Sequence, residues 1–444
     1  MHRLRPTRSV LDIADRLERA GFEAWCVGGA IRDSLLGGAP LDWDLATSAH
    51  PDQVREIFGR KRTIPVGIEF GTVSVLDGDG LAHEVTTFRH DVHTDGRHAV
   101  VEFGASLDED LARRDFTINA IAYRPSTGEL RDPFGGQQDI KAGLVRAVGD
   151  PEQRMKEDRL RALRAIRFAA RYRFDIEART LAALSSSAPF LTRLSAERVQ
   201  QEMMKTMEQV EVPSVAFRQW RSTGALAVLV PSLAEIDDVA LGTLDFLPRD
   251  GAAGRNVPQR TVNRLAALFL DVAAPVTALA LRTLRFSRVD AAWCVAIGER
   301  WQEVSRQLEG AAGERRPTDA EVRGLLARVG RMQVGGLFRV ALARWSARRF
   351  AGLPAPSERA VRDLYHRVLR SRYRDPIEVA DLAIGGDELR AAGIPPGPIY
   401  AKILQSLLQR VLELPARNTP QALLAELPDV LAALQASPTI SPTH

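Results

Sequence analysis

The sequence predicts an α+β domain at the N-terminus followed by an all-α region that makes up the rest of the chain. Between residues 24 and about 123 short β-like runs alternate with turn-forming glycines, whereas from 155 to 444 helix-like stretches follow one another, separated mainly by prolines. The chain has 444 residues, of which 45% are hydrophobic, so it can bury a large core divided among about two to four structural units.

Individual elements are predicted from periodicity and from the residues that begin or end them. Residues 9–20 have apolar side chains at positions 10, 13, 14 and 17, which predicts an amphipathic helix that Ser9 begins and Gly21 ends. The strands predicted in the N-terminal domain are 24–28, 42–46, 72–76, 82–87 and 118–123. In the helical region the stretches 248–258 and 309–319 are candidate unit boundaries.

Composition limits the classes of protein to which the chain can belong. The formal net charge is +4 and the basic residues are mostly arginine, which is compatible with a polyanionic partner. Cys26 and Cys294 lie in apolar stretches and form neither a disulfide framework nor a zinc-ligand spacing. No run approaches the roughly 18 apolar residues of a membrane span, and no signal peptide follows Met1. We therefore expect a soluble, cytoplasmic protein.

A glycine pair and two carboxylates near the N-terminus form a pattern that favours phosphate and metal binding. Gly28 and Gly29 end the first predicted strand and begin a helix, so the backbone there can approach a phosphate closely. Asp42 and Asp44 are two residues apart on the next predicted strand and should project from one face. A cation such as Mg²⁺ between them would relieve their repulsion. Either motif alone is usually a turn or loop fragment.

This combination resembles the active-site signature of the DNA polymerase β-type nucleotidyltransferases. The longer run 28–33 resembles the branch that contains bacterial class II tRNA nucleotidyltransferases, or CCA-adding enzymes, and poly(A) polymerases. The resemblance implies a nucleotidyltransferase head with a small mixed sheet. It also implies that Asp42 and Asp44 are catalytic residues that hold Mg²⁺, and that Gly29 and Arg32 bind the nucleotide.

The segment 111–120 carries two cations and a carboxylate beside an apolar run. Arginine suits triphosphate oxygens because its planar guanidinium donates hydrogen bonds in pairs and stays charged. Such a cluster in isolation is more often a solvated group of ion pairs. The run resembles the second motif of the same family, which makes Arg114 and Arg113 candidate phosphate-binding residues. Asn119 would hold a turn or contact the ribose.

A helix predicted over 157–171 carries the candidate base-recognition residues. Asp158 and Arg161 are three residues apart and should be neighbours on one helical surface, with Arg164 and Arg167 continuing the stripe. An Arg-rich amphipathic helix with solvated arginines is the alternative. The stretch resembles the family's nucleotide-recognition motif, in which the Asp and the first Arg read the base and the later arginines hold phosphate or support that reading.

The chemistry of an Asp–Arg pair explains which bases it would select. A carboxylate accepts from an exocyclic amine and a guanidinium donates to a ring acceptor, so the pair matches cytosine and adenine. Guanine and uracil present a carbonyl in place of the amine, a mismatch that costs roughly 1–3 kcal/mol. Selection of C and A would therefore need no nucleic-acid template.

Two other groups of residues are candidate metal ligands. Glu84, on the strand predicted over 82–87, is a third carboxylate for the Mg²⁺ site, and a solvent-facing glutamate on an edge strand is an equal alternative. The polar segment 88–107 contains three histidines, but no ordered ligand spacing favours a metal there. This segment instead resembles the flexible loop of family members that add the terminal A, which favours A addition.

Two later stretches extend the resemblance. Residues 194–202 resemble a fifth motif that braces the nucleotide-binding helices, although capping by Ser195 and a Glu197–Arg198 pair would explain them structurally, so we assign them no chemistry. Residues 383–404 resemble the tail of tRNA nucleotidyltransferases. The alternative is a purely structural role as a rigid corner between two helices. The Arg-rich stretch 338–374 would supply phosphate contacts.

The sequence is therefore identified as a member of the tRNA nucleotidyltransferase family, with a role in tRNA processing. We expect an Mg²⁺-dependent transferase that adds CCA to the 3′ end of tRNA from CTP and ATP without a template, releasing pyrophosphate. The alternatives are an A-adding enzyme, a poly(A) polymerase, or an inactive RNA-binding protein. No oligomeric state is indicated. The expected domains are a catalytic head, a nucleotide-recognition neck, a body and a tRNA-binding tail: 1–150, 151–205, 206–312 and 313–444.

Overall fold

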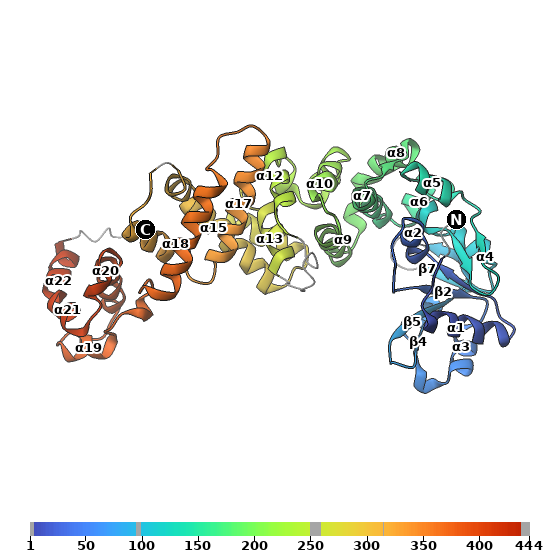
Figure 1. The fold of residues 1–444 in the computed structure, drawn as a ribbon, viewed down its shortest axis with the longest axis horizontal. Helices are drawn as coiled ribbons and strands as arrows, with labels where there is room; N and C mark the ends of the chain where they lie inside the picture. The colour runs from blue at the N-terminus through green and yellow to red at the C-terminus, as the bar shows by residue number, and fades with distance from the viewer. Residues whose placement is uncertain (1–3, 95–98, 249–258, 314, 437–444) are drawn as a thin grey trace. The chain divides into compact units, whose positions relative to one another are not determined.

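The computed structural model describes residues 4–94, 99–248, 259–313 and 315–436, and it divides into two compact units (Figure 1). The first unit is Met1–Glu235 and the second is Ile236–His444. The first contains the sheets and the second is helical, so the predicted fold class is confirmed. The finer division into head, neck, body and tail stays a prediction.

A seven-stranded mixed sheet organises the first unit, with the strand order β3-β4-β5-β2-β1-β8-β9. Strands β2 and β5 run parallel, whereas the other neighbouring pairs run antiparallel. Buried apolar side chains from the central strands pack against the surrounding helices. The strands are β1 Ala24–Val27, β2 Asp44–Thr47, β3 Thr63–Ile64, β4 Thr72–Leu76, β5 Ala82–Thr87, β8 Ala122–Arg124 and β9 Glu129–Arg131.

Helices and two small sheets complete the first unit. Strands β6 Arg89–Thr94 and β7 Ala99–Phe103 form an antiparallel hairpin, and β10 Leu144–Val145 pairs in parallel with β11 Asp175–Ile176. The α-helices are α1 Arg8–Arg19, α2 Gly29–Leu35, α3 Pro51–Phe58, α4 Leu107–Ala112, α5 Gly136–Ala142, α6 Pro151–Glu157, α7 Leu160–Tyr172, α8 Ala178–Ser187, α9 Ala196–Gln209, α10 Pro213–Ser222 and α11 Ala225–Leu229.

The second unit consists of helices within its described residues. One of its cores lies around α20, where apolar side chains of the last helices pack together. None of the described helices of the chain has the length and apolar character that a membrane span requires. The α-helices of this unit are α12 Asp238–Thr243, α13 Gln259–Leu268, α14 Ala274–Thr283, α15 Arg288–Ala311, α16 Asp319–Val329, α17 Val334–Phe350, α18 Glu358–Arg374, α19 Gly386–Ala391, α20 Ile399–Glu413, α21 Pro420–Ala425 and α22 Leu427–Ala436.

Some predicted element boundaries are wrong. The strand predicted over 118–123 is a 3-10 turn, Thr117–Asn119, followed by β8, because the chain turns there to meet α5. The segment 88–107, which has no regular sequence periodicity, contains the β6–β7 hairpin. Thr7, rather than Ser9, caps α1 by accepting from the backbone N–H of Val10. Residues 95–98, 249–258 and 314 lie outside the described residues, so the predictions made for them are not assessed.

We predict that Gly136→Ala destabilises the first unit. A Cβ atom at this first residue of α5 would lie 2.1 Å from the carbonyl oxygen of Thr117, a backbone atom that cannot move aside alone. The free energy of unfolding should fall by at least roughly 1–3 kcal/mol, as measured by urea denaturation. Gly78→Ala is the matched control because its Cβ would meet no atom within 4 Å. Equal stability of the two variants would contradict the predicted clash.

Candidate nucleotide-binding site

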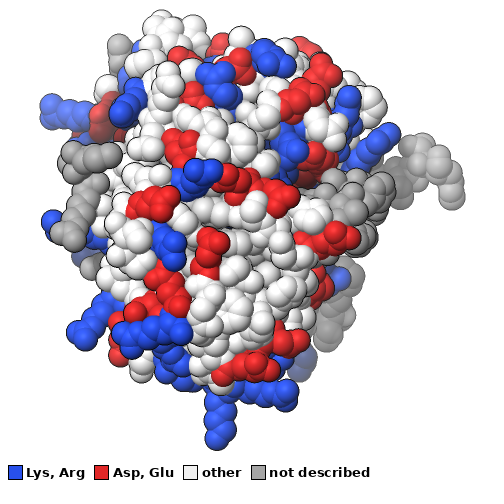
Figure 2. Space-filling view, turned by 90° about the vertical axis from the view of Figure 1, so that its right-hand side faces the viewer, with Lys and Arg blue, Asp and Glu red and all other residues white. Residues whose placement is uncertain are grey.

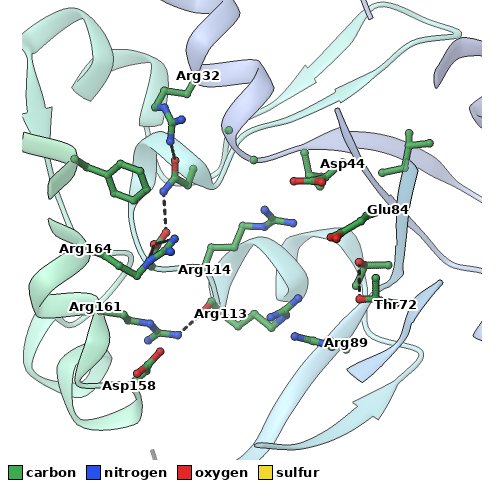
Figure 3. A pocket seen from close by; sticks show the side chains of 18 residues that line it. Arg32, Asp44, Thr72, Glu84, Arg89, Arg113, Arg114, Asp158, Arg161 and Arg164 are labelled. Carbon is green, nitrogen blue, oxygen red and sulfur yellow. Dashed lines mark hydrogen bonds and ion pairs between the residues drawn. The ribbon is translucent and has the colours of Figure 1, made fainter. Parts of the chain in front are cut away.

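One cavity of about 470 Å³ in the first unit brings together side chains from the sheet, from α2 and from α7 (Figure 3). The strand that carries Asp44 and the motif predicted to recognise the base therefore face one cleft. Both lie in a single compact unit. The predicted site residues that line the cavity are Gly29, Arg32, Asp44, Glu84, Arg113, Arg114, Asn119, Asp158, Arg161 and Arg164.

The Gly28–Gly29 turn lies close against charged side chains of the cavity. Gly28 has a φ of +79°, which L side chains rarely adopt, and a Cβ there would lie 3.2 Å from an Nη atom of Arg114. The same Cβ would lie 3.8 Å from a carboxylate oxygen of Asp44. A side chain at this position would therefore enter the space between the cation and the carboxylate.

The carboxylates sit side by side on the sheet because of the strand register. Asp44 is the first residue of β2, and Leu45 pairs with Val85 in the parallel β2–β5 ladder, which makes Asp44 and Glu84 neighbours. Burial within the cleft raises the pKa of Asp44 to about 6, and repulsion from Glu84 and Asp42 adds to this effect against an opposing contribution from Arg114. The carboxylates thus create a local excess of negative charge that a cation would neutralise.

Asp42 departs from the prediction because it precedes β2 and does not line the cavity. The side chain of Trp43 is buried and donates to the carbonyl of Pro40 at 2.9 Å, which holds residues 40–43 in a turn. Asp42 and Asp44 nevertheless both have exposed surface on either side of Trp43, although the walls of the cleft around Asp44 still desolvate its carboxylate. Asp42 is close enough to perturb the pKa of Asp44.

The cavity offers two neighbouring carboxylates, Asp44 and Glu84, as ligands for a divalent cation. The described residues contain no group of three or more His, Cys, Asp or Glu side chains arranged to hold a metal ion. Mg²⁺ commonly takes only one or two protein carboxylates and completes its shell with water and substrate phosphates. The two neighbouring carboxylates of β2 and β5, with their elevated negative charge, fit that requirement.

Asp110, a residue that the sequence analysis did not single out, holds both arginines of the 111–120 segment. Its buried carboxylate accepts from the guanidinium of Arg113 at 2.9 and 3.1 Å and from that of Arg114 at 3.2 Å. The i, i+3 and i, i+4 spacing from Asp110 at the end of α4 was a signal that could have identified this pairing. The Nε atom of Arg114 is buried and has no hydrogen-bond partner in the described structure.

A chain of hydrogen bonds connects α2 to α7 along the wall of the cavity (Figure 3). The guanidinium of Arg32 donates to the side-chain oxygen of Asn119, whose amide nitrogen donates to Asp115 at 2.9 Å. Asp115 in turn accepts from Arg164 at 2.7 and 2.9 Å. Burial alone would raise the pKa of Asp115, but Arg164 and Asn119 outweigh it and lower that pKa. Asn119 therefore orients Arg32 rather than holding only a turn.

The prediction of one continuous helix over 157–171 is wrong, because the helix is interrupted at Asp158. Helix α6 ends at Glu157, Asp158 has extended backbone angles, and α7 begins at Leu160. The Asp158 carboxylate accepts from the backbone N–H of Leu160 at 3.0 Å, which satisfies a free donor at the start of α7. Asp158 and Arg161 both line the cavity, but they are not neighbours on one continuous helical surface.

The side chains of Asp158 and Arg161 do not bond to each other: Asp158 pairs with an arginine of α9, and Arg161 pairs with a glutamate of α6. Arg198 of α9 donates to Asp158 at 2.7 Å, so the stretch 194–202 does contact the recognition motif. Arg161 donates to Glu157 at 2.8 Å and to the carbonyl of Arg113 at 2.9 Å. Sequence reasoning missed the role of Arg198 because the partner lies forty positions away. Capping of α9 by Ser195 is confirmed.

Arg167, like Asp42, is a predicted site residue that does not line the cavity. Its guanidinium is buried and pairs with the buried carboxylate of Glu202 at 2.7 and 2.9 Å, with a further bond to Gln209 at 3.1 Å. It also lies 4.4 Å from the ring centroid of Phe168, which does line the cavity. Arg167 thus joins α7 to α9 and supports the cavity wall from behind.

Comparison with known proteins identifies similar domains and full-length relatives. Residues 24–146 match the family described as the poly(A) polymerase head domain, and residues 173–237 match a probable RNA and SrmB-binding site of polymerase A. The CCA-adding enzyme of Limosilactobacillus fermentum is 33% identical, and the match covers 96% of this chain and 97% of the relative. That of Levilactobacillus brevis is 47% identical over 44% of this chain and 49% of the relative, so this match spans about half of the relative.

Solved structures of CCA-adding enzymes are also similar to this chain. The Bacillus stearothermophilus CCA-adding enzyme in complex with CTP is 30% identical, with a TM-score of 0.73 over 96% of this chain and 98% of that chain. The Thermotoga maritima CCA-adding enzyme complexed with tRNA is 23% identical, with a TM-score of 0.64 over 96% of this chain and 94% of that chain, and at this identity only the fold is shared.

We predict that Glu202→Ala strongly destabilises the first unit because it leaves the buried Arg167 cation without its carboxylate. The free energy of unfolding should fall by about 3–5 kcal/mol, measured by urea denaturation. The matched control is Glu211→Ala, because Glu211 pairs with Arg173 at the same 2.7 Å but both side chains are exposed. That control should change stability by less than about 1 kcal/mol. Similar losses in both variants would show that burial of the Arg167 pair does not matter.

Proposed function

The chain belongs to the family of CCA-adding enzymes, and we propose that it adds C, C and A to the 3′ end of tRNA from CTP and ATP, releasing pyrophosphate. The observation that carries this proposal is the single cavity that holds both the Asp44–Glu84 carboxylates and the Asp158–Arg161 residues. A reacting phosphate and a selected base would lie at opposite ends of one bound nucleotide. A cavity of about 470 Å³ is of a size suited to such a ligand.

The arginines of the cavity would bind the triphosphate. Arg114 lies beside the Gly28 turn, with its guanidinium held from behind by Asp110, and Arg113 shares that anchor. Arg32 and Arg164 are held through Asn119 and Asp115. These fixed cations favour a bound triphosphate without first having to be ordered by it. Gly29 lets the backbone approach the phosphates, and Arg167 acts indirectly by supporting α7.

The carboxylates would hold Mg²⁺, with Asp44 and Asp42 as proposed ligands and Glu84 as the third. When bound, the ion would neutralise charge on the α-phosphate and help to align the tRNA 3′-hydroxyl with it. The 3′-oxygen forms a bond to the α-phosphorus while the bond to the departing pyrophosphate breaks. Asp44 and Glu84 place the acidic face of the sheet next to the arginines, so the reacting group lies between opposite charges.

Base selection would depend on Asp158 and Arg161, acting without a template. The carboxylate would accept from the amine of cytosine or adenine, and the guanidinium would donate to the ring acceptor. In the structure Arg198 holds Asp158, and Glu157 holds Arg161, so both side chains are ordered at the cavity wall before a base binds. The segment 88–107, which contains the paired strands β6 and β7, resembles the loop of family members that add the terminal A, and this favours A addition as well as C addition.

The remaining parts of the chain would bind the RNA. We propose the divisions 151–205, 206–312 and 313–444 as neck, body and tail after the catalytic head 1–150, with the tail contacting tRNA. Figure 2 displays a face of the first unit, on which basic and acidic side chains are mixed. The contacts of the later helices with RNA phosphates would depend on the arginines of those helices. A cytoplasmic location fits a tRNA-processing role.

Nucleotide addition to a defined acceptor tests the proposal. Purified protein with Mg²⁺ and a tRNA transcript lacking CCA should extend it by three nucleotides only when CTP and ATP are both supplied, as resolved on a sequencing gel. Extension by A alone on a transcript that ends in CC, with none by C, would indicate an A-adding enzyme. Long A tracts would indicate a poly(A) polymerase, and binding without extension an inactive RNA-binding protein.

We predict that Asp44→Ala abolishes nucleotide addition while the affinity for tRNA stays within about twofold of the wild-type value. Asp44 provides one carboxylate at the reacting phosphate, whereas RNA binding depends on other surfaces. Incorporation is measured by gel assay and affinity by fluorescence anisotropy with labelled tRNA. Asp79→Ala, at an exposed turn away from the cavity, serves as the control and should retain full activity. Turnover by the Asp44 variant would remove the metal assignment.

A further inference from the structure

One wall of the cavity is not used by the nucleotide contacts proposed above. It is formed by Thr72, Thr86 and Arg89, which line the cavity next to Glu84. In Figure 3 the labelled Thr72, Glu84 and Arg89 lie on one side of the cavity, and Asp158, Arg161 and Arg164 lie on the other. The carboxylates of Asp44 and Glu84 therefore lie on the same side of the cavity as this wall, and Arg113 and Arg114 lie between the two sides.

The strand register makes this wall a continuation of the acidic face. Glu84 and Thr86 are two residues apart on β5 and project from the same face. Thr72 on β4 pairs directly with Thr86, and the two hydroxyl groups are 3.0 Å apart. Two hydroxyl groups thus lie one step along the strand from Glu84, exposed to the same cavity.

Arg89 adds a positioned cation at the end of this wall. Its guanidinium donates to the carbonyl of Phe70 and lies 6.0 Å from the centroid of the Phe70 ring, so the side chain is held against the sheet. Arg89 begins β6 immediately after the buried Phe88. A pair of hydroxyl groups and a fixed guanidinium match a ribose and a phosphate, the two repeating groups of an RNA strand.

We propose that Thr72, Thr86 and Arg89 bind the 3′-terminal nucleotide of the acceptor RNA. This inference rests on the proposed function, because transfer requires two substrates to meet at the α-phosphate. The attacking oxygen and the leaving pyrophosphate lie roughly in line on opposite sides of that phosphorus. With the triphosphate and base held by the arginines and Asp158, the acceptor approaches from the side of Glu84. The hydroxyl pair contacts the terminal ribose and Arg89 contacts its 5′-phosphate.

The first experiment separates acceptor binding from nucleotide binding. Arg89→Ala should raise the KM for a tRNA acceptor roughly tenfold, the loss expected for a charge-assisted phosphate contact, and leave the KM for CTP within about twofold. Arg62→Ala is the matched control: Arg62 also donates to a backbone carbonyl, that of Leu76 at 2.9 and 3.2 Å, but does not line the cavity. Arg62→Ala should leave both KM values unchanged. Arg89→Lys keeps a positive charge, so its KM for tRNA should lie between those of the wild type and Arg89→Ala.

The second experiment uses a substitution that preserves shape. Thr86→Val removes one hydroxyl group, so it should reduce the preference for an acceptor ending in ribose over one ending in 2′-deoxyribose, measured as the ratio of kcat/KM values. A rise in the CTP KM of Arg89→Ala equal to the rise for tRNA, or an unchanged ratio in Thr86→Val, would overturn the assignment. If the wild-type protein adds no nucleotide, the proposed function itself is overturned. If the wild-type protein extends tRNA normally but either variant gives the contradicting result named above, only this inference is overturned.

Discussion

Arginines that share one small cavity repel one another, and the structure keeps them in place with acidic side chains bonded to their guanidinium groups. Asp110 holds the guanidinium groups of Arg113 and Arg114, and Asp115 holds that of Arg164, whereas Glu202 holds Arg167 behind the cavity wall. These carboxylates are buried, so their attraction for the cations is only weakly screened by water. The rest of the site depends on this arrangement, because it makes a concentrated positive charge compatible with a stable fold.

The balance differs on the opposite side of the cavity. There Asp44 and Glu84 lie next to each other on neighbouring parallel strands, and the pKa of Asp44 is raised first by desolvation and then by repulsion from Glu84 and Asp42, with Arg114 opposing both effects. A cavity with compensated cations on one side and excess negative charge on the other suits a ligand that carries phosphate oxygens and a divalent cation together. The sheet register and the helix contacts produce this asymmetry directly.

Sequence patterns predicted the parts of the site that depend on local spacing. The Gly28 turn, Asp44 and most of the arginines could be identified because each is defined by a few consecutive residues. Asp115, Arg198 and their bonds could not, because their partners are about 40 or more positions away and only the folded chain brings them together. Helix formers surround Asp158, so local propensity predicted a continuous helix there. The bond to Leu160 and the pairing with Arg198 favour the break instead.

Asp158 combines a structural task with the base selection proposed for it. The carboxylate proposed to discriminate among bases also anchors the first turn of α7, the helix that carries Arg161 and Arg164. A substitution that admitted a different base would at the same time loosen the element on which the other recognition side chains are mounted. The set of bases that such an enzyme accepts would therefore be hard to change by substituting this residue. Each variant would lose the ordering of the first turn of α7 as well as the preference for a base.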